Sequence, residues 1–368
     1  MTHENLYPLT FVPVYKDYLW GGDRIARRYG RAGTSATCAE SWEIADRPDG
    51  MSVVVNGPLA GASLRTLVQE FGARLLGTAV PSPVFPLLIK IIDPRQRLSL
   101  QVHPNEKAAR ATGGEPKTEM WFVLEADPDA RVFTGLKPGT TADLFQKALS
   151  NRRLEEILQS VALAAGDAVF IPAGRVHAVD AGSLLLEIQQ NSNTVYRVHD
   201  WDRTGPDGKP RELHLAQALK SIHWDDGSET PAITTQGGND VAVSCDRAAA
   251  SGRAAAGRAM LRSEATQAKD ALALPVPPIT GALLWQEVLS CPYFRLERLT
   301  FGQPLTCRND GRSFHALFAW EGETQIAAAG MEQTMAPGSS WLLPAGMAEY
   351  RLVPGIASAR LLRISVPA

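Results

Sequence analysis

Residues 97–104, RLSLQVHP, alternate between apolar and polar side chains, and this pattern predicts an extended strand. The two leucines and the valine fall on one face of that strand, whereas Ser99, Gln101 and His103 share the other. The preceding run, PVFPLLIKIIDP, is almost continuously apolar, which is typical of a strand buried on both faces. Burying an unpaired polar group costs about 2–7 kcal/mol. We therefore expect a partner inside the protein to satisfy these three polar side chains.

Short apolar runs bounded by glycine, proline and aspartate recur along the chain, and this spacing is typical of an all-β sandwich or barrel. Two stretches instead carry apolar residues at intervals of three and four. That periodicity predicts helices within residues 62–77 and 141–161. The sequence thus predicts a mainly β protein with a few helices.

The N-terminal and C-terminal parts of the chain each contain one copy of an internal repeat. Residues 166–177 fit the frame G-x5-P-x-G-x2-H, and residues 338–349 repeat it with Glu349 in the place of His177. An aromatic strand pattern precedes each copy, EMWFVLEADPDA in the first and HALFAWEGETQI in the second. The repeat indicates a bicupin, that is, two jelly-roll β-barrels of which the second has lost its site. His315, at the repeat position of Glu119, is expected to pack or to form a hydrogen bond.

The repeat also suggests a division of the chain into domains. We assign residues 1–240 to a metal-binding cupin domain with helical insertions, and residues 285–368 to a second, degenerate cupin domain. Residues 241–284 would form a connecting segment, because the stretch from Ser244 to about Leu274 is rich in alanine, arginine and glycine.

The frame that ends at His177 is the second half of the cupin signature, whose first half supplies a close pair of ligands and a later glutamate. Gln101 and His103 form such a pair on one strand face, and Glu119 is the natural glutamate. A lone interior histidine is more often a hydrogen-bonded core residue, and Glu119 by itself could be solvated. Together the four residues favour a nitrogen and oxygen site for one Zn2+ per chain.

Composition narrows the class of protein. The 368 residues are 45% hydrophobic and 21% charged, with a formal net charge of −2, which argues against broad electrostatic binding to nucleic acid or to a membrane. The four cysteines, at positions 38, 245, 291 and 307, form no close pair and suggest neither disulfides nor a cysteine metal site. With no transmembrane stretch and a polar start, MTHENLYPL, we expect a cytoplasmic monomer or weak homo-oligomer.

A more specific likeness lies in the segments around these residues. They read WGG from Trp20, GTSATCAESWEIADRPDG, FPLLIKIIDPRQRLSLQVHPNE, GEPKTEMWFVL, GDAVFIPAGRVHAV and LLLEIQQNSNTVYRVHDWDR. Together they resemble type I mannose-6-phosphate isomerase in its shorter bacterial form. The likeness spans most of residues 7–225 and weakens toward the C-terminus, and its most specific part is the combination of QVHP, KTE and YRV-DWDR.

The resemblance implies a zinc-dependent aldose–ketose isomerase that interconverts mannose 6-phosphate and fructose 6-phosphate through an enediol(ate). It also implies the metal ligands Gln101, His103, Glu119 and His177. The reactive arginine of the family matches Arg197, and a serine associated with the substrate phosphate matches Ser99. The family lysine before the glutamate ligand matches Lys117, although a threonine stands between the two here.

The chemistry leaves several roles open. Moving a carbonyl between neighbouring carbons requires a group that removes and returns a proton. Arg197 could stabilise the developing oxyanion or clamp phosphate, and Lys117 could bind phosphate or shuttle the proton. Glu187, on the alternating strand LLLEIQQ, is an alternative acid or base, or else a surface carboxylate or a hydrogen-bond partner of a ligand. The segment HDWD resembles a ligand cluster, but we expect turn hydrogen bonds from it.

Two other functions fit the same fold. An iron-dependent cupin oxygenase would use similar histidine and carboxylate ligands, and a non-catalytic sugar-phosphate-binding cupin would keep the pocket without turnover. The basic residues Lys117 and Arg197 favour an anionic substrate.

Overall fold

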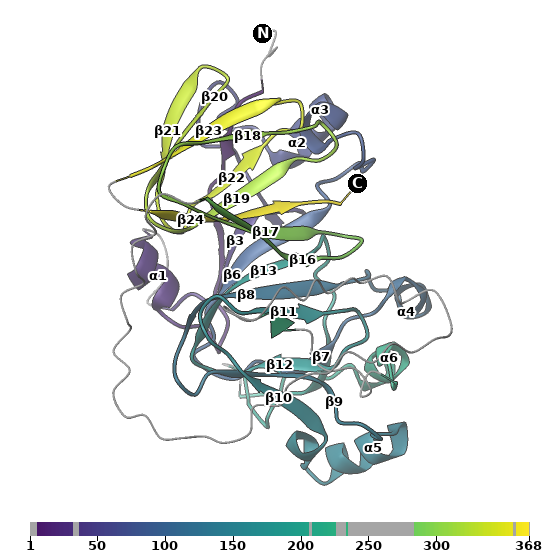
Figure 1. Cartoon of the computed structure of the whole chain (residues 1–368). Coiled ribbons are helices and arrows are strands. Elements are labelled where there is room, and N and C mark those ends of the chain that lie inside the picture. The colour runs from purple at the N-terminus through teal and green to yellow at the C-terminus, as the bar shows by residue number, and fades with distance from the viewer. Residues whose placement is uncertain are drawn as a thin grey trace, which may run out of the picture.

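The computed structural model describes residues 6–31, 37–205, 208–225, 233–234, 283–355 and 358–367. Four β-sheets lie one above another along the molecule, and short helices lie at their margins (Figure 1). The mainly β fold is therefore confirmed. Cys245 and the predicted connecting segment lie outside the described residues, except for the last two positions of that segment.

The first half of the chain forms two antiparallel sheets. The seven-stranded sheet has the order β15 (Ile233–Thr234), β11 (Ala168–Ile171), β8 (Glu119–Ala126), β13 (Ser183–Gln190), β6 (Leu87–Ile92), β3 (Glu40–Ile44) and β2 (Val14–Lys16). The five-stranded sheet has the order β10 (Leu158–Ala162), β9 (Arg131–Leu136), β12 (His177–Val179), β7 (Leu100–Val102) and β14 (Tyr196–His199). A small hairpin joins β4 (Asp46–Arg47) to β5 (Gly50–Met51).

The second half repeats this arrangement. Its six-stranded sheet has the order β1 (Leu9–Thr10), β22 (Ser340–Leu343), β19 (His315–Glu321), β24 (Ala359–Ser365), β17 (Arg295–Phe301) and β16 (Leu284–Ser290). Its four-stranded sheet has the order β18 (Leu305–Arg308), β23 (Glu349–Pro354), β20 (Thr324–Ala328) and β21 (Met331–Met335). Gly166 and Gly338 begin the two copies of the repeated frame with φ of +89° and +83°, a conformation that favours glycine. The internal repeat is thus visible in the backbone.

Each half consists of two open sheets that face each other. No strand order among the described residues closes on itself, so the predicted jelly rolls are sandwiches rather than closed barrels. Apolar side chains such as Leu185 and Val132 fill the first sandwich, and Leu361 and Leu352 fill the second. Each half therefore has its own interior.

Helices cover the edges and outer faces. They are α1 (Arg24–Tyr29), α2 (Leu64–Phe71), α3 (Ala73–Leu76), α4 (Glu106–Thr112), α5 (Ala142–Ser150), the 3₁₀ turn η1 (Leu154–Glu156) and α6 (Leu215–Ser221). The helix predicted for residues 141–161 was wrong in its last part. The chain leaves α5 through Arg152, whose φ is +57°, and Leu158–Ala162 pairs with β9, because tertiary pairing outweighs the local periodicity.

The seven-stranded sheet is buried on both faces. Its outer face carries Ile89, Phe122 and Leu186, which belong to the same apolar cluster as Phe318 and Leu362 of the six-stranded sheet. The other face looks into the first sandwich. This double burial explains why the strand that contains LLIKII is almost continuously apolar.

The two halves share backbone pairing as well as side-chain packing. β1 comes from the N-terminal segment but pairs with β22, with Leu9 opposite Leu342. The turn after α3 also donates backbone hydrogen bonds to the second half, from Thr78 to Gly311 and from Ala79 to Arg312. The N-terminal segment therefore completes the sheet of the C-terminal half.

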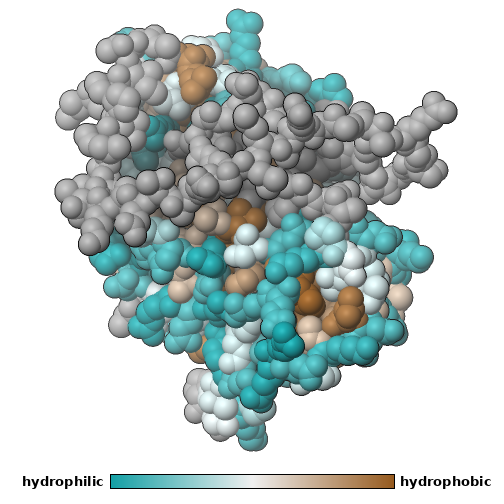
Figure 2. All heavy atoms as spheres, turned by 60° about the horizontal axis from the view of Figure 1, so that its bottom comes forward, coloured by the Kyte–Doolittle hydropathy of each residue, from teal (hydrophilic) through white to brown (hydrophobic). Residues whose placement is uncertain are grey.

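The face shown in Figure 2 is mainly hydrophilic over the described residues, with small separate apolar patches, as is usual for protein surface in water. Among the described residues, no helix has the length and apolar character required to cross a membrane.

We expect Phe318→Ala to destabilise the joint between the two halves. Phe318 is 1% exposed and packs in the shared cluster, so its truncation should lower the free energy of unfolding by about 3–5 kcal/mol. Glu349→Ala, at an exposed side chain, should change it by no more than about 0.5 kcal/mol. Equilibrium denaturation in urea measures both values, and equal stability of the two variants would show that the joint does not contribute.

Candidate metal centre and active site

The strand register brings three predicted residues together. β7 lies between β12 and β14, and Gln101 on β7 is opposite His177 on one side and Arg197 on the other. His103 follows directly after β7, two residues beyond Gln101, so both side chains lie on the same face. Residues far apart in the sequence thus meet at one point because neighbouring antiparallel strands hold them in register.

Glu119 completes the cluster from the opposite sheet, at the first position of β8. Its Oε2 lies 3.3 Å from His103 Nε2, and its Oε1 lies 3.3 Å from His177 Nε2. One ligand atom from each of the three residues lies within 4.8 Å of the others, and all three side chains are buried. This is the only such cluster of three or more potential metal ligands among the described residues.

The protonation of the cluster suits a cation. Burial lowers the pKa of His103 to about 3, with help from the nearby Lys117, and burial also lowers the pKa of His177. Burial would raise the pKa of Glu119, but Lys117 and His103 outweigh it and hold that pKa well below its usual range. Two neutral imidazoles and one carboxylate therefore offer lone pairs.

The hydrogen bonds of the two histidines also fit a metal. His177 Nδ1 lies 2.8 Å from the carbonyl oxygen of Arg175, which fixes this nitrogen as the donor and turns Nε2 toward the cluster. Neither ring nitrogen of His103 makes a hydrogen bond within the described part of the chain, although both are buried. A metal ion would satisfy such an imidazole, and the residues present therefore fit one.

Gln101 presents the nitrogen of its side-chain amide, rather than the oxygen, to the cluster. Its Nε2 lies 3.2 Å from His177 Nε2, while its Oε1 accepts a long hydrogen bond of 3.5 Å from Ser99. An amide oxygen is the end that ligates a metal, so this side chain would have to rotate by half a turn to serve as the fourth ligand.

A row of buried charges leads away from the cluster. Lys117 Nζ lies 2.8 Å from Glu119 Oε2 and 3.4 Å from Glu187 Oε1. Lys90 Nζ lies 3.6 Å from Glu187 Oε1 and 3.3 Å from Glu40 Oε2. We call these five side chains the charge row. Acidic and basic groups alternate along it, so each charge has an oppositely charged neighbour.

The charge row shifts the pKa values of its members in opposite directions. Burial raises the pKa of Glu187 to about 7, although the neighbouring Lys90 opposes the rise. Burial would lower the pKa of Lys90, but Glu187 and Glu40 outweigh it and raise that pKa above its ordinary value. Glu187 is thus the member whose charge can change near neutral pH.

Arg197 lies at the edge of this arrangement. It is half-buried, and its Nη1 donates a hydrogen bond of 2.7 Å to the carbonyl oxygen of Glu212. Its Nε is buried without a hydrogen-bond partner in the described residues. Burial lowers the pKa of Arg197, and the nearby Arg211 lowers it further, whereas Asp200 opposes the shift.

Two members of the charge row, Lys90 and Glu40, were missed by sequence reasoning. A signal was present, because a lysine within LLIKII is rarely buried unless it is paired. In the HDWD segment, the backbone N–H of Trp201 donates to His199 Nδ1 and that of Arg203 donates to the carbonyl oxygen of Asp200, which are the expected turn hydrogen bonds, and Asp200 also forms ion pairs with Arg203 and Arg211.

Comparisons with known proteins identify relatives of this chain. Residues 9–133 match the family model described as phosphomannose isomerase type I, catalytic domain. A probable mannose-6-phosphate isomerase of Bacillus subtilis, GmuF, is 35% identical over 247 residues, which cover 66% of this chain and 76% of that protein. Mannose-6-phosphate isomerase ManA of the same organism is 38% identical over 228 residues, or 61% and 69% of the two chains.

This chain belongs to the type I mannose-6-phosphate isomerase family.

The crystal structure of a mannose 6-phosphate isomerase from Bacillus subtilis superposes with a TM-score of 0.75 at 25% identity, covering 97% of this chain and 99% of that one. The similarity extends over both halves, although the family model matches only part of the first. The described residues of both halves thus share the fold of that mannose 6-phosphate isomerase.

The second half has none of the cluster's ligands at the equivalent positions. His315 Nδ1 lies 3.0 Å from the hydroxyl of Tyr350, which confirms the expectation of a hydrogen bond. Glu349 is exposed and lies 3.7 Å from Arg308. Both residues therefore have structural partners.

We expect His177→Ala to remove the metal from this isomerase-family protein. The variant loses one of three convergent ligands, so its metal content should fall from about one per chain to near zero. His315→Ala, the matched change in the second half, should keep the metal. Elemental analysis of dialysed protein measures both, and a His177→Ala protein with full metal content would exclude His177 as a ligand.

Proposed function

We propose that this protein interconverts mannose 6-phosphate and fructose 6-phosphate, with one zinc ion held by Gln101, His103, Glu119 and His177. The observation that carries the proposal is the buried His103, Glu119 and His177 cluster beside two lysines, in a chain of the type I family. Two imidazoles, a carboxylate and an amide oxygen form a set of donors that suits Zn2+ and leaves room for substrate oxygens. When bound, zinc would supply Lewis acidity to the substrate carbonyl and hydroxyl.

The protein groups supply the proton transfer. Isomerisation moves one proton between two neighbouring carbons, through an enediol(ate), and a buried base at the site can carry that proton. Glu187 is 3% exposed, and its Oε1 is flanked by Lys117 and Lys90 at 3.4 and 3.6 Å. We assign the proton transfer to Glu187 or to Lys117. The side chains of these two residues contact each other at 3.4 Å, so the protonation of one depends on the charge of the other.

The anionic part of the substrate would face Arg197 and Ser99. The side chain of Arg197 combines a fixed charge with a planar fork, which matches both a phosphate and a developing oxyanion. Ser99 is 5% exposed and adds a hydroxyl donor beside Gln101.

A coupled assay tests the proposal directly. The full chain, loaded with zinc, should convert mannose 6-phosphate to fructose 6-phosphate and lose this activity on chelation. A folded, metal-bound protein without turnover would point to a sugar-phosphate-binding protein. Bound iron together with uptake of oxygen would point to an oxygenase instead.

We expect Arg197→Lys to separate charge from geometry. The lysine keeps the positive charge but loses the bidentate fork, so kcat/KM should fall by about 100-fold or more while folding and metal content stay unchanged. A rise in KM alone would indicate phosphate binding in the ground state, and a fall in kcat alone would indicate stabilisation of the enediolate. Arg351→Lys, on an exposed face of β23, serves as the control. Wild-type kinetics in Arg197→Lys would refute the assignment.

A further inference from the structure

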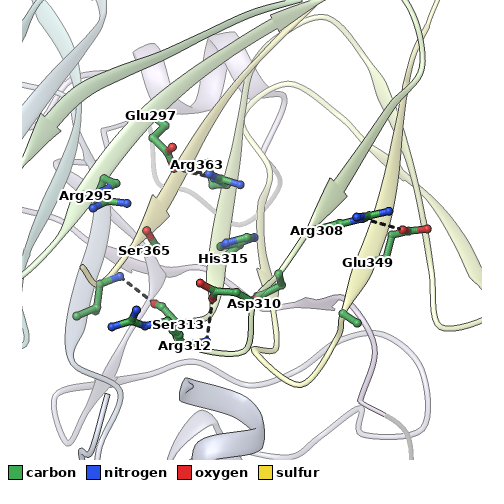
Figure 3. A pocket seen from close by; sticks show the side chains of 13 residues that line it. Arg295, Glu297, Arg308, Asp310, Arg312, Ser313, His315, Glu349, Arg363 and Ser365 are labelled. Carbon is green, nitrogen blue, oxygen red and sulfur yellow. Dashed lines mark hydrogen bonds and ion pairs between the residues drawn. The ribbon is translucent and has the colours of Figure 1, made fainter. Parts of the chain in front are cut away.

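A polar cavity of about 660 Å³ opens in the second sandwich (Figure 3). Its lining includes Arg295, Arg308, Arg312 and Arg363, together with His315. The volume is in the range of small-molecule sites. The metal cluster and the charge row contribute nothing to this cavity, and its role is independent of the isomerase activity proposed above.

The strand register shows where this cavity lies relative to the repeat. In the first half, Glu187 on β13 is opposite Lys90 on β6, and Glu119 begins β8 on the other side of β13. Because Glu187 is opposite Trp121, two residues beyond Glu119, the side chains of Glu119, Glu187 and Lys90 share one face and point into the first sandwich.

The second half repeats this pattern position by position. Arg363 on β24 is opposite Glu297 on β17, and it is opposite Leu317, two residues beyond His315 at the start of β19. His315, Arg363 and Glu297 therefore occupy the three positions that Glu119, Glu187 and Lys90 hold in the first half. The cavity of the second half therefore lies at the position that is equivalent to the metal centre of the first half.

The chemistry at these three positions is inverted. A carboxylate that faces the metal cluster is replaced by His315, and the next carboxylate is replaced by the guanidinium of Arg363. The positions of the carboxylates Glu119 and Glu187 in the first half thus carry an imidazole and a guanidinium in the second, where four arginines line the cavity. We propose that this cavity binds a small oxyanion, namely the phosphate or carboxylate group of a metabolite.

A buried donor in the lining supports an acceptor ligand. Asn309 is 8% exposed, and its Oδ1 accepts a hydrogen bond of 2.9 Å from the backbone N–H of Gly311. That contact leaves Nδ2 as the remaining donor, and Nδ2 is buried without a hydrogen-bond partner among the described residues. An oxyanion, which accepts but does not donate, would satisfy it.

The carboxylates of the lining are already engaged. Glu297 accepts from Arg363 Nε at 2.8 Å and from Trp285 Nε1 at 2.8 Å. Asp310 accepts from the backbone N–H of Arg312 at 2.9 Å, and Glu349 is paired with Arg308 at the side of the cavity. Of the four arginines in the lining, Arg295 is paired with Glu287, Arg308 with Glu349 and Arg363 with Glu297, whereas no carboxylate is paired with the side chain of Arg312 in the described part of the chain.

The test uses the full-length, metal-loaded protein and two probes, inorganic phosphate and succinate. Isothermal titration calorimetry should detect binding of at least one probe, and the double variant Arg295→Gln/Arg312→Ala should weaken it at least tenfold. The same variant should keep its isomerase kcat/KM within twofold, because both residues lie outside the metal centre. Arg351→Ala, which removes an exposed arginine from β23 outside the cavity, is the matched control and should bind as wild type does.

The active site is a second place where phosphate could bind, so the titration is repeated in Arg197→Lys. Binding that persists there and is lost in the double variant supports the cavity, and the probe that binds tighter identifies the ligand as phosphate or carboxylate. Should the double variant melt at a lower temperature, Arg312→Ala by itself, at an exposed side chain, replaces it. Identical isotherms for wild type and these variants, or no binding in wild type, would overturn the proposal.

Discussion

The seven-stranded sheet is covered on both faces, and every polar side chain that points from it must therefore find a partner inside the protein. One face carries apolar side chains such as Phe122 and Leu186, which pack against Phe318 of the second half and need no polar partner. The other face looks into the first sandwich, where Glu187 and Lys90 are buried and water cannot solvate their charges. The site and the joint between the halves are thus opposite sides of one sheet.

Because they are buried together, the charged side chains of the charge row depend on one another for stabilisation. A charge that loses its partner in such surroundings costs about 3–5 kcal/mol, so each member of the charge row restrains the position of the next. Lys117 is held between Glu119 and Glu187, which fixes it at the boundary between the metal cluster and the rest of the charge row. Rigid placement of this kind is what an isomerase requires, because the base must reach two neighbouring carbons without moving far.

Much of the first half could be predicted because alternation with a period of two identifies the faces of a strand. Gln101 and His103 are two apart, and their shared face follows from the sequence. The repeat frame likewise located His177, and the structure places it opposite Gln101.

Other features required the pairing between strands. Lys90 and Glu40 lie in segments whose two faces are both buried, so their polarity pattern does not distinguish a functional face from a core face. The strand that follows α5 was mistaken for a helix because its pairing with β9 is not encoded in local periodicity. The inverted charges of the second sandwich likewise become visible only when Arg363 is aligned with Glu187 through the register of each sheet.

The position of β1 has a consequence for how the chain reaches this structure. Leu9 leaves the ribosome early, yet its strand partner Leu342 is synthesised near the end. Contacts of such high sequence separation carry a large loop-closure cost and form slowly. The six-stranded sheet therefore keeps an incomplete edge until the first strand docks on β22, and in that interval the edge is open to pairing with another chain. Docking of the N-terminal strand covers this edge at Trp341 and Leu342.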